Sequence, residues 1–357
     1  KAARGAGLSP LTKLALGGAA LAALVTGAMA ANVTPTVGTT TTINTSGTAG
    51  SPVLDTTSSG TTVHMNDNLT AIDIGNTSNT DYIDLTNNAT LTTNGANVLQ
   101  ITNGDNNIIR NYGALTAATS GAAVAITAGD SNTVANAVGA TMSGVTSAIT
   151  TDSGTTNTSI QIDGGTVSST SGGGTAINLQ GSGSVLVRAG ATVTSNNGTA
   201  VYVKTVSNGG SVELDGTLNN SVSGTRSLVI DTFASTGGVV ANGTLNGGIT
   251  INTSLSAGNY VDVTGGTIKD TDETGISVTG GMATGSRIYN AGDIGSVSQR
   301  VGTQGIRVDG TVNGTIAVGY IAGSPDTVDA ASIYSTGDSI LVASLDSGTI
   351  KTSSNAI

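Results

Sequence analysis

The sequence predicts a right-handed, single-stranded parallel β-helix with about 25 residues and three short strands per turn. A first repeat phrase carries this prediction: a small residue, then often Thr, then one aliphatic residue. Successive aliphatic positions of this phrase are separated by 24, 27, 25, 26, 25, 27, 23 and 26 residues, a period typical of a solenoid. These positions are Leu91, Leu115, Met142, Val167, Val193, Leu218, Leu245, Ile268 and Ile294.

Two further phrases accompany the first within each repeat. The second is a pair of aliphatic residues one residue apart, as in segments 177–179 and 201–203. The third is a similar pair that ends at a turn, as in segments 185–187 and 212–214. Alternation of apolar and polar residues predicts strands, and the Gly, Asn and Asp residues between them favour turns. A β-sandwich would also have turns every 8–12 residues, but it would not need one phrase in phase over nine repeats.

The composition supports short stacked strands and excludes a cysteine framework. The 357 residues include 53 Gly, one Phe and no Trp, and 37% of them are hydrophobic while only 10% are charged. Disordered chains are usually poor in aliphatic residues and rich in charge, so this composition does not indicate disorder. The absence of Cys excludes disulfides and thiolate metal sites.

Residues 1–30 have the pattern of a secretory signal peptide. Lys1, Arg4 and Lys13 form a positive amino-terminal region, and residues 14–25 form an apolar stretch. This stretch is shorter than the ~20 residues that a membrane span needs. We therefore expect cleavage after an A-x-A motif, with Ala28 and Ala30 in the motif and Ala31 as the first residue of the mature chain.

The remainder of the chain is predicted to have two parts. Residues 31–60 are rich in Thr, Ser and Gly and are expected to form a linker or an amino-terminal cap, and residues 61–357 are expected to form the β-helix. Beyond residue 312 the period loosens. There we assign Val312, Ile316 and Ile350 to the first phrase, and 318–333 to an inserted loop or irregular turn. Because no polar cap closes the last turn, we expect this sequence to be truncated at its carboxyl-terminal end.

The charge distribution argues against a nucleic acid partner. After residue 13 the chain carries nine Lys and Arg residues against 22 acidic residues, a balance of −13. Nucleic acid binding requires clustered cations, which are lacking here. A strongly acidic balance instead suits a soluble surface exposed to the medium.

A leader followed by a Cys-free, Gly/Ser/Thr/Asn-rich β-helix resembles the passenger region of bacterial autotransporters, which use type V secretion. The resemblance rests on the motif at residues 28–30 and on repeats such as 165–179, and it covers nearly the whole chain. It implies an exported adhesin or structural stalk at the cell surface or outer membrane, with a host, surface or matrix ligand as partner. It also implies an outer-membrane β-barrel translocator in cis, whose aromatic girdle strands this sequence does not contain.

The sequence offers little for catalysis, and we expect no enzyme. The one histidine, His64, lies near Asp67 and Asp73, while the candidate nucleophiles Ser131 and Ser339 lie in ordinary turn contexts rather than in a strand–elbow–helix setting. A polysaccharide-degrading β-helix is an alternative, but it would need clustered carboxylates. Here the Asp residues recur about once per turn, as turn chemistry alone would produce.

Calcium is the one metal for which the sequence offers oxygen ligands at close spacing. Segments 103–107 and 270–273 are rich in Asn, Asp and Glu, but they match neither the EF-hand loop nor the calcium-binding nonapeptide repeat. We read both as polar turns and predict no metal and no cofactor.

The first phrase also predicts an ordered polar surface. Residues that flank its aliphatic position face outward in a strand, so the threonines of successive repeats should form a ladder. Such a ladder is a possible binding surface for ice or another crystal, although Thr also simply suits an exposed strand. The threonines of the predicted ladder are Thr90, Thr141, Thr166, Thr192, Thr217 and Thr244.

Overall fold

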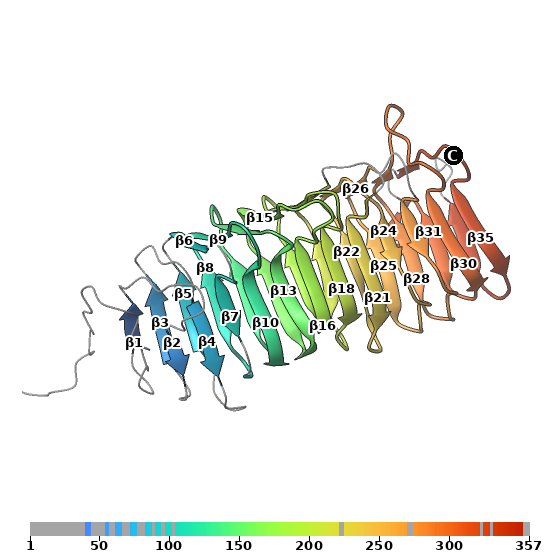
Figure 1. The fold of residues 1–357 in the computed structure, drawn as a ribbon. Helices are drawn as coiled ribbons and strands as arrows, with labels where there is room; N and C mark the ends of the chain where they lie inside the picture. The colour runs from blue at the N-terminus through green and yellow to red at the C-terminus, as the bar shows by residue number, and fades with distance from the viewer. Residues whose placement is uncertain are drawn as a thin grey trace, which may run out of the picture.

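The computed structural model is an all-β solenoid whose parallel strands stack along one axis (Figure 1). It describes residues 40–43, 54–56, 61–65, 72–76, 83–87, 90–93, 97–101, 104–220, 225–269, 274–321, 324–328 and 331–352. No helix occurs within these ranges. The arrangement confirms the predicted parallel β-helix and is consistent with right-handed winding. Each turn of chain contributes strands to three faces.

Face 1 is a ten-stranded parallel sheet that contains all nine predicted first phrases. Successive strands pair so that the aliphatic residue of one phrase lies beside that of the next, as for Val167 and Val193. The strands of face 1 are β6 (Thr90–Thr93), β9 (Ala114–Ala117), β12 (Thr141–Gly144), β15 (Thr166–Ser169), β17 (Thr192–Ser195), β20 (Thr217–Asn220), β23 (Thr244–Leu245), β26 (Thr267–Ile268), β29 (Asp293–Ile294) and β34 (Ser332–Ile333).

Face 2 contains the second phrases, paired in parallel and in register. Ile177 lies beside Val201, and Val201 lies beside Leu228. The strands of face 2 are β2 (Leu54–Thr56), β4 (Ile72–Asn76), β7 (Leu99–Ile101), β10 (Ala122–Asp130), β13 (Ser147–Thr156), the first half of β16 (Ile177–Val187), β18 (Val201–Val206), β21 (Leu228–Phe233), β24 (Ile249–Ile251), β27 (Ile276–Val278), β30 (Ile306–Val312) and β35 (Ile340–Leu345).

Face 3 contains the third phrases. It joins face 2 in one sheet because β16 runs around the corner, pairing with β18 on face 2 and with β19 on face 3. The other strands of face 3 are β1 (Thr40–Ile43), β3 (Thr61–Met65), β5 (Ile83–Asn87), β8 (Ile108–Asn111), β11 (Thr133–Asn136), β14 (Thr158–Ile162), β19 (Ser211–Leu214), β22 (Gly237–Ala241), β25 (Asn259–Val263), β28 (Arg287–Asn290), β31 (Thr315–Val318) and β36 (Thr349–Thr352).

The parallel pairing extends into the segment 31–60 that was expected to form a linker or cap. Strand β1 pairs with β3, and β2 pairs with β4, both in parallel. These two strands therefore lie in the same stack as the turns that follow them. The predicted signal peptide, including Ala28, Ala30 and Ala31, lies outside the described residues.

The core is a set of aliphatic columns inside the coil. On face 1 the inward position of every described turn from Leu115 to Ile294 is fully buried. Because parallel strands stack at about 4.8 Å, each inward side chain packs on the equivalent side chains of the turns before and after it. The inward column of face 1 is Leu115, Met142, Val167, Val193, Leu218, Leu245, Ile268 and Ile294.

A buried asparagine ladder closes the end of face 3 in three successive turns. Asn87, Asn111 and Asn136 each end a strand and are fully buried. The Nδ2 of Asn87 donates to Oδ1 of Asn111 at 2.8 Å, and Nδ2 of Asn111 donates to Oδ1 of Asn136 at 2.8 Å. Asn136 in turn donates to the carbonyl of Gly164 at 3.0 Å. The ladder thus satisfies buried amides by stacking them across turns.

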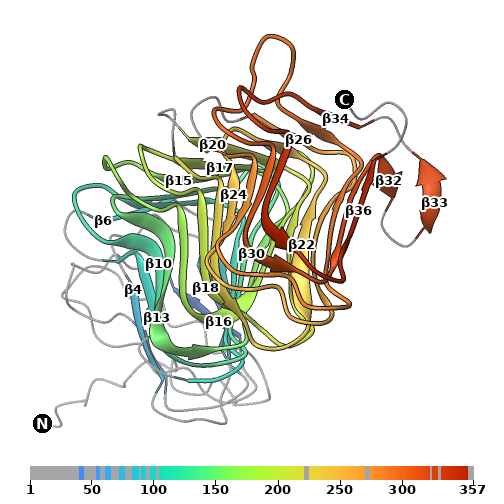
Figure 2. The same ribbon diagram turned by 90° about the vertical axis from the view of Figure 1, so that its right-hand side faces the viewer.

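An insertion interrupts the repeat after β31. Strands β32 (Tyr320–Ile321) and β33 (Ser324–Val328) form an antiparallel hairpin, which projects from the coil in Figure 2. The structure thus confirms an insertion within 318–333, although Val318 still belongs to β31 and the last residues return to face 1. There Ser332 and Ile333 pair with Asp293 and Ile294.

Our assignment of three later aliphatic residues to the first phrase was wrong. Ile316 and Ile350 pair with each other on face 3, and Val312 pairs with Leu345 at the end of a face 2 strand. The tenth first phrase is instead the one that contains Ile333. The physical reason is that inward aliphatic residues alternate with polar ones on all three faces, so the pattern alone cannot assign a face once an insertion breaks the period.

Gly165 occupies a position that only glycine fits. Its φ is +67°, and a Cβ there would meet the carbonyl oxygen of Ala140 in the preceding turn. We expect Gly165→Ala to lower the free energy of unfolding by about 2 kcal/mol or more, because left-handed backbone strain adds to the clash. Gly139→Ala is the matched control: φ is +80° but no atom lies within 4 Å of the Cβ position, so it should cost only about 1 kcal/mol. If both variants lowered the free energy of unfolding equally in chemical denaturation, the contact with the Ala140 carbonyl oxygen would not be the reason that position 165 requires glycine.

Candidate binding surface

The described threonines of the predicted ladder lie on the outer side of face 1 in one column. The register runs from Thr141 through Thr166, Thr192 and Thr217 to Thr244, one residue per turn. All five are at least partly exposed. The structure adds Thr267, which pairs with Thr244. Thr90 lies in β6, but its neighbour in register is Ala114, so a residue without a hydroxyl separates it from the continuous column.

A second polar column runs parallel to the first, two residues further along each strand. It passes from Thr116 through Ser143, Ser168 and Thr194 to Asn219. Asn246 continues it, donating from Nδ2 to Oδ1 of Asn219 at 2.5 Å. Along each column the spacing is about 4.8 Å, and between the columns it is about 6.6 Å.

The hydroxyl groups of the threonine column are available to solvent or a ligand. Among the described residues, none of the six threonines from Thr141 to Thr267 uses its hydroxyl in a hydrogen bond to the protein. The buried aliphatic column directly beneath holds their backbone positions. Face 1 therefore presents a flat array of hydroxyls at fixed spacing.

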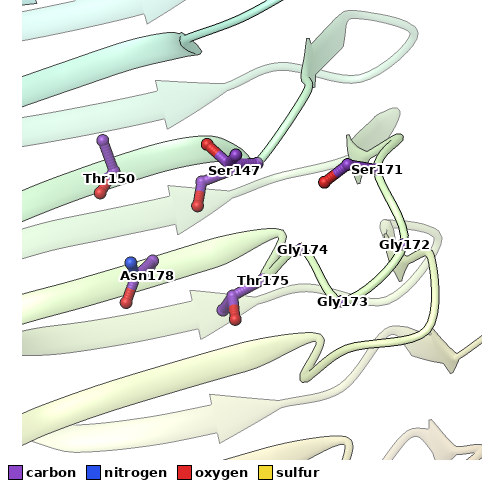
Figure 3. Close-up of a pocket in the computed structure, with 9 residues that line it drawn as sticks. Ser147, Thr150, Ser171, Gly172, Gly173, Gly174, Thr175 and Asn178 are labelled. Carbon is purple, nitrogen blue, oxygen red and sulfur yellow. The ribbon is translucent and has the colours of Figure 1, made fainter.

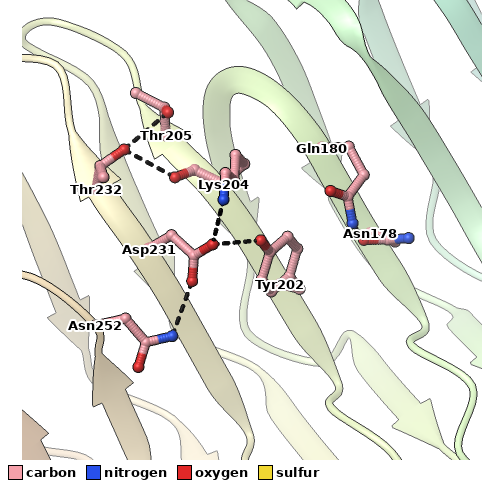
Figure 4. A network of polar contacts seen from close by, with 8 residues as sticks. All are labelled: Asn178, Gln180, Tyr202, Lys204, Thr205, Asp231, Thr232 and Asn252. Carbon is pink, nitrogen blue, oxygen red and sulfur yellow. Dashed lines mark hydrogen bonds and ion pairs between the residues drawn. The ribbon is translucent and has the colours of Figure 1, made fainter.

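A network of polar side chains centred on Asp231 lies on the outer side of face 2 (Figure 4). The carboxylate accepts a hydrogen bond from the Tyr202 hydroxyl at 2.6 Å and pairs with the Lys204 ammonium at 2.8 Å. Nδ2 of Asn252 donates to its other oxygen at 2.8 Å. Burial alone would raise the pKa of Asp231, but these three partners outweigh that effect and hold the pKa below its usual range.

The same network raises the pKa of Tyr202 to about 12, through burial first and then through the hydrogen bond to Asp231. Because the folded pKa lies above the ordinary value of 10.0, the protonated phenol contributes stability below pH 10 and loses it as the pH rises through about 12. We expect a late tyrosinate step in an ultraviolet absorbance titration. Tyr202→Phe should remove the part of this step that lies near pH 12, while a late contribution from Tyr260 remains, because burial raises the pKa of that ring as well. A titration unchanged by Tyr202→Phe would contradict the assignment.

An arginine clamp lies on the outer side of face 3. Arg287 binds both carboxylate oxygens of Asp262, at 3.1 Å and 2.5 Å, and its guanidinium carbon lies 4.6 Å from the centre of the Tyr260 ring and 5.4 Å from that of Tyr289. The Asp262 side chain is only 3% exposed. Burial raises the pKa of Asp262, and the carboxylate raises the pKa of Arg287. These contacts join β25 to β28, and the two charged groups of the cluster, Arg287 and Asp262, are paired with each other.

The serine candidates of the sequence lie in turns. Ser131 has a φ of 55°, and its hydroxyl donates to Asp130 at 2.9 Å. Asp130 also accepts from Thr156 at 2.5 Å and from Asn157 at 2.9 Å, and these bonds lower its pKa. Ser339 is exposed between β34 and β35.

The histidine candidate lies far from both serines in the chain. His64 lies in β3 beside Thr42 and Thr86 in register, and Asp67 lies outside the described residues.

The polar segments considered for calcium are only partly described. In the first, Asn107 is buried and its Nδ2 donates to Oδ1 of Asn132 at 2.9 Å, while a carboxylate oxygen of Asp105 accepts from the backbone of Asp130 at 2.7 Å. The second, 270–273, lies outside the described residues. Within the ranges that the structure covers, no three His, Cys, Asp or Glu side chains gather closely enough to hold a metal ion.

Comparison with known proteins gives no relative for this chain: no family, no curated protein and no solved structure matches it. In the part of the chain that the structure describes, no helix has the length and apolar character to cross a membrane. Sequence reasoning found the outward columns of face 1, but it missed the Asp231 network, the arginine clamp and the asparagine ladder. The signal for all three is a pair of complementary side chains 24 to 29 residues apart.

Proposed function

We propose that this chain is an exported passenger-type β-helix that acts at the bacterial cell surface as an adhesin or a structural stalk. The observation that carries the proposal is the continuous outward array of face 1, in which six threonines repeat in register along one axis. A rod with the same polar surface on each turn can contact an extended ligand at many points. Each contact is weak, but their number raises the overall affinity.

The acidic net charge and the N-terminal leader pattern also support export. With a formal net charge of −10 the chain repels copies of itself in the medium, and the absence of Cys suits passage through a narrow pore unfolded. A translocator barrel in cis, and a host, surface or matrix ligand, belong to this proposal. It assigns the protein no catalytic step.

Export and attachment can be tested separately in a Gram-negative host that carries the full chain with a start codon. If the proposal holds, the exported protein begins at Ala31 by amino-terminal sequencing. Ala28→Asp together with Ala30→Asp should keep the leader attached, because a cleavage site needs small residues at these positions. Beads coated with the purified chain should adhere to a matrix-coated surface. Retention of the uncleaved wild-type chain inside the cell, or no adhesion above uncoated beads, would refute the proposal.

The regular spacing of face 1 favours a second candidate, binding to an ordered surface such as ice. Polar groups that repeat about every 4.8 Å along two columns, which lie about 6.6 Å apart, can meet a periodic surface at many points at once. Thr166→Lys and Thr192→Lys should then abolish inhibition of ice growth, because a long cation breaks the flat array. Gln161→Lys, on the outer side of face 3, is the matched control and should retain it. No inhibition by the wild-type chain would remove this candidate.

A further inference from the structure

We propose that a polar depression on the edge of face 2 binds a neutral saccharide. This inference rests on the proposed attachment function, for which it names the ligand class. The depression has a volume of about 340 Å³, within the lower range of small-molecule sites. It lies where the turn between β15 and β16 approaches the start of β13 (Figure 3). Its lining includes Thr146, Ser147, Thr150, Ser171, Thr175 and Asn178.

The lining hydroxyls lack partners within the protein. Among the described residues, no hydrogen bond is made by the side chains of the five hydroxyl residues that line the depression. Ser147 is only 4% exposed as a residue, but its hydroxyl oxygen is not among the fully buried polar atoms that lack a partner, so it still opens onto the depression. A hydroxyl that has no partner in the protein and opens onto a depression can bond to a ligand in place of water. Each hydroxyl can both donate and accept, as the hydroxyls of a sugar can.

An amide at the floor of the depression adds directed hydrogen bonds. The Oδ1 of Asn178 accepts a hydrogen bond from Nε2 of Gln180 at 2.8 Å, which fixes the orientation of the Asn178 amide. Its Nδ2 then remains as a donor. Together with the hydroxyls, it supplies the mixed donors and acceptors that recognise a polyhydroxylated ring.

The charge of the depression selects against ionic ligands. None of its nine lining residues carries a charge. A phosphate or a uronate would lose hydration there without meeting a cation, and an amine would meet no carboxylate. A neutral saccharide loses only hydroxyl hydration, which the lining can replace.

An aromatic ring extends the site beyond the depression. Tyr202 is the neighbour of Asn178 in register, so its Cα lies about one strand spacing away. The ring is partly exposed, and its hydroxyl is held by Asp231 at 2.6 Å. Aromatic rings present an apolar face with a polar tip, so a second sugar unit can lie against this ring. The geometry therefore points to an oligosaccharide that runs from the depression along face 2.

The test uses the purified full chain and a panel of neutral tetrasaccharides built from glucose, mannose and galactose, with an oligogalacturonate as the charged counterpart. Saturation-transfer NMR detects binding, and calorimetry measures affinity. At least one neutral tetrasaccharide should bind, and more tightly than the oligogalacturonate. The variant Thr150→Val with Thr175→Val, which keeps side-chain shape, should weaken binding roughly tenfold or more. Thr133→Val, which removes an unpaired hydroxyl on the outer side of face 3, should leave the affinity unchanged.

Three results would overturn the inference: no binding by any neutral member of the panel, tighter binding of the charged oligomer, or equal affinities for the wild type and the double variant with an unaltered melting temperature. These outcomes are separate from a failure of the proposed function. Adhesion that persists without saccharide binding would overturn only the ligand class. Saccharide binding by a chain that is not exported would overturn only the location.

Discussion

Arg287→Met is expected to lower the free energy of unfolding by about 3 kcal/mol, because it leaves the Asp262 carboxylate buried without its partner. Breaking a fully buried ion pair by removing one partner costs about 3–5 kcal/mol. The low end applies here, since the Arg287 side chain is 36% exposed while that of Asp262 is 3% exposed. The measurement is chemical denaturation of wild type and variant at neutral pH.

The matched control is an exposed pair with the same spacing of 25 residues. Arg188 lies 2.7 Å from Asp163, but the side chains are 57% and 41% exposed. Arg188→Met should therefore change stability by no more than about 0.5 kcal/mol. Adding Asp262→Val to Arg287→Met should restore most of the loss, since no charge is then buried. Similar losses for both arginine variants, or no recovery in the double variant, would show that the clamp does not work through charge burial.

The same variant should respond to pH in a defined direction. Burial already raises the pKa of Asp262 in the wild type, and loss of Arg287 raises it further. A carboxylate with a folded pKa above its unfolded value of about 3.9 favours folding when protonated. The stabilisation that protonated Asp262 gives the folded state is complete below the unfolded pKa and is lost as the pH rises through the folded pKa. The deficit of Arg287→Met relative to wild type should thus shrink as the solution is acidified.

Leu218→Ala is expected to have an effect of similar size, about 3–5 kcal/mol, through loss of core packing. Leu218 is fully buried on face 1, between Val193 and Leu245 in register. The cavity left by the Leu218 side chain lies between two turns that parallel pairing holds in place, so the neighbouring side chains cannot easily move in to fill it. The readout is the free energy of unfolding by denaturant.

The neighbouring Thr217 provides the control, because its side chain points to the other side of the same strand. Thr217→Ala should alter stability by no more than about 0.5 kcal/mol. The contrast tests the inward and outward assignment of face 1 directly. A loss at Thr217 as large as that at Leu218 would show that the register is displaced by one residue.

Much of the fold was predictable because one short phrase recurs with a nearly constant period. All nine first phrases occupy one sheet, and the second and third phrases occupy the other two faces. Prediction failed where the hairpin of β32 and β33 lengthens a turn. The distance from Ile294 to Ile333 is 39 residues, and within it Ile316 offered a better-spaced but incorrect partner. Local alternation defines a strand, but only an unbroken period defines its face.

The candidate surfaces were predictable to different degrees. The threonine columns follow from register alone, since any residue beside an inward position points outward. The Asp231 network depends on side chains of three different turns, and its members are ordinary residues in the sequence. The unpaired Ser147 hydroxyl depends on the path of a turn rich in glycine, which no periodic pattern specifies. Such features emerge only when neighbouring turns are placed side by side.

The constant register of face 1 also spaces its outward residues evenly along the axis of the coil. Thr141 and Thr267 are five turns apart, which places them roughly 24 Å from each other along the axis. Any distance in between can be selected in steps of about 4.8 Å by choosing the turn. Chemical groups attached at two of these outward threonines would be held at a known separation. The coil could therefore serve as a calibrated scaffold for measuring how far apart two receptors must be to engage one ligand.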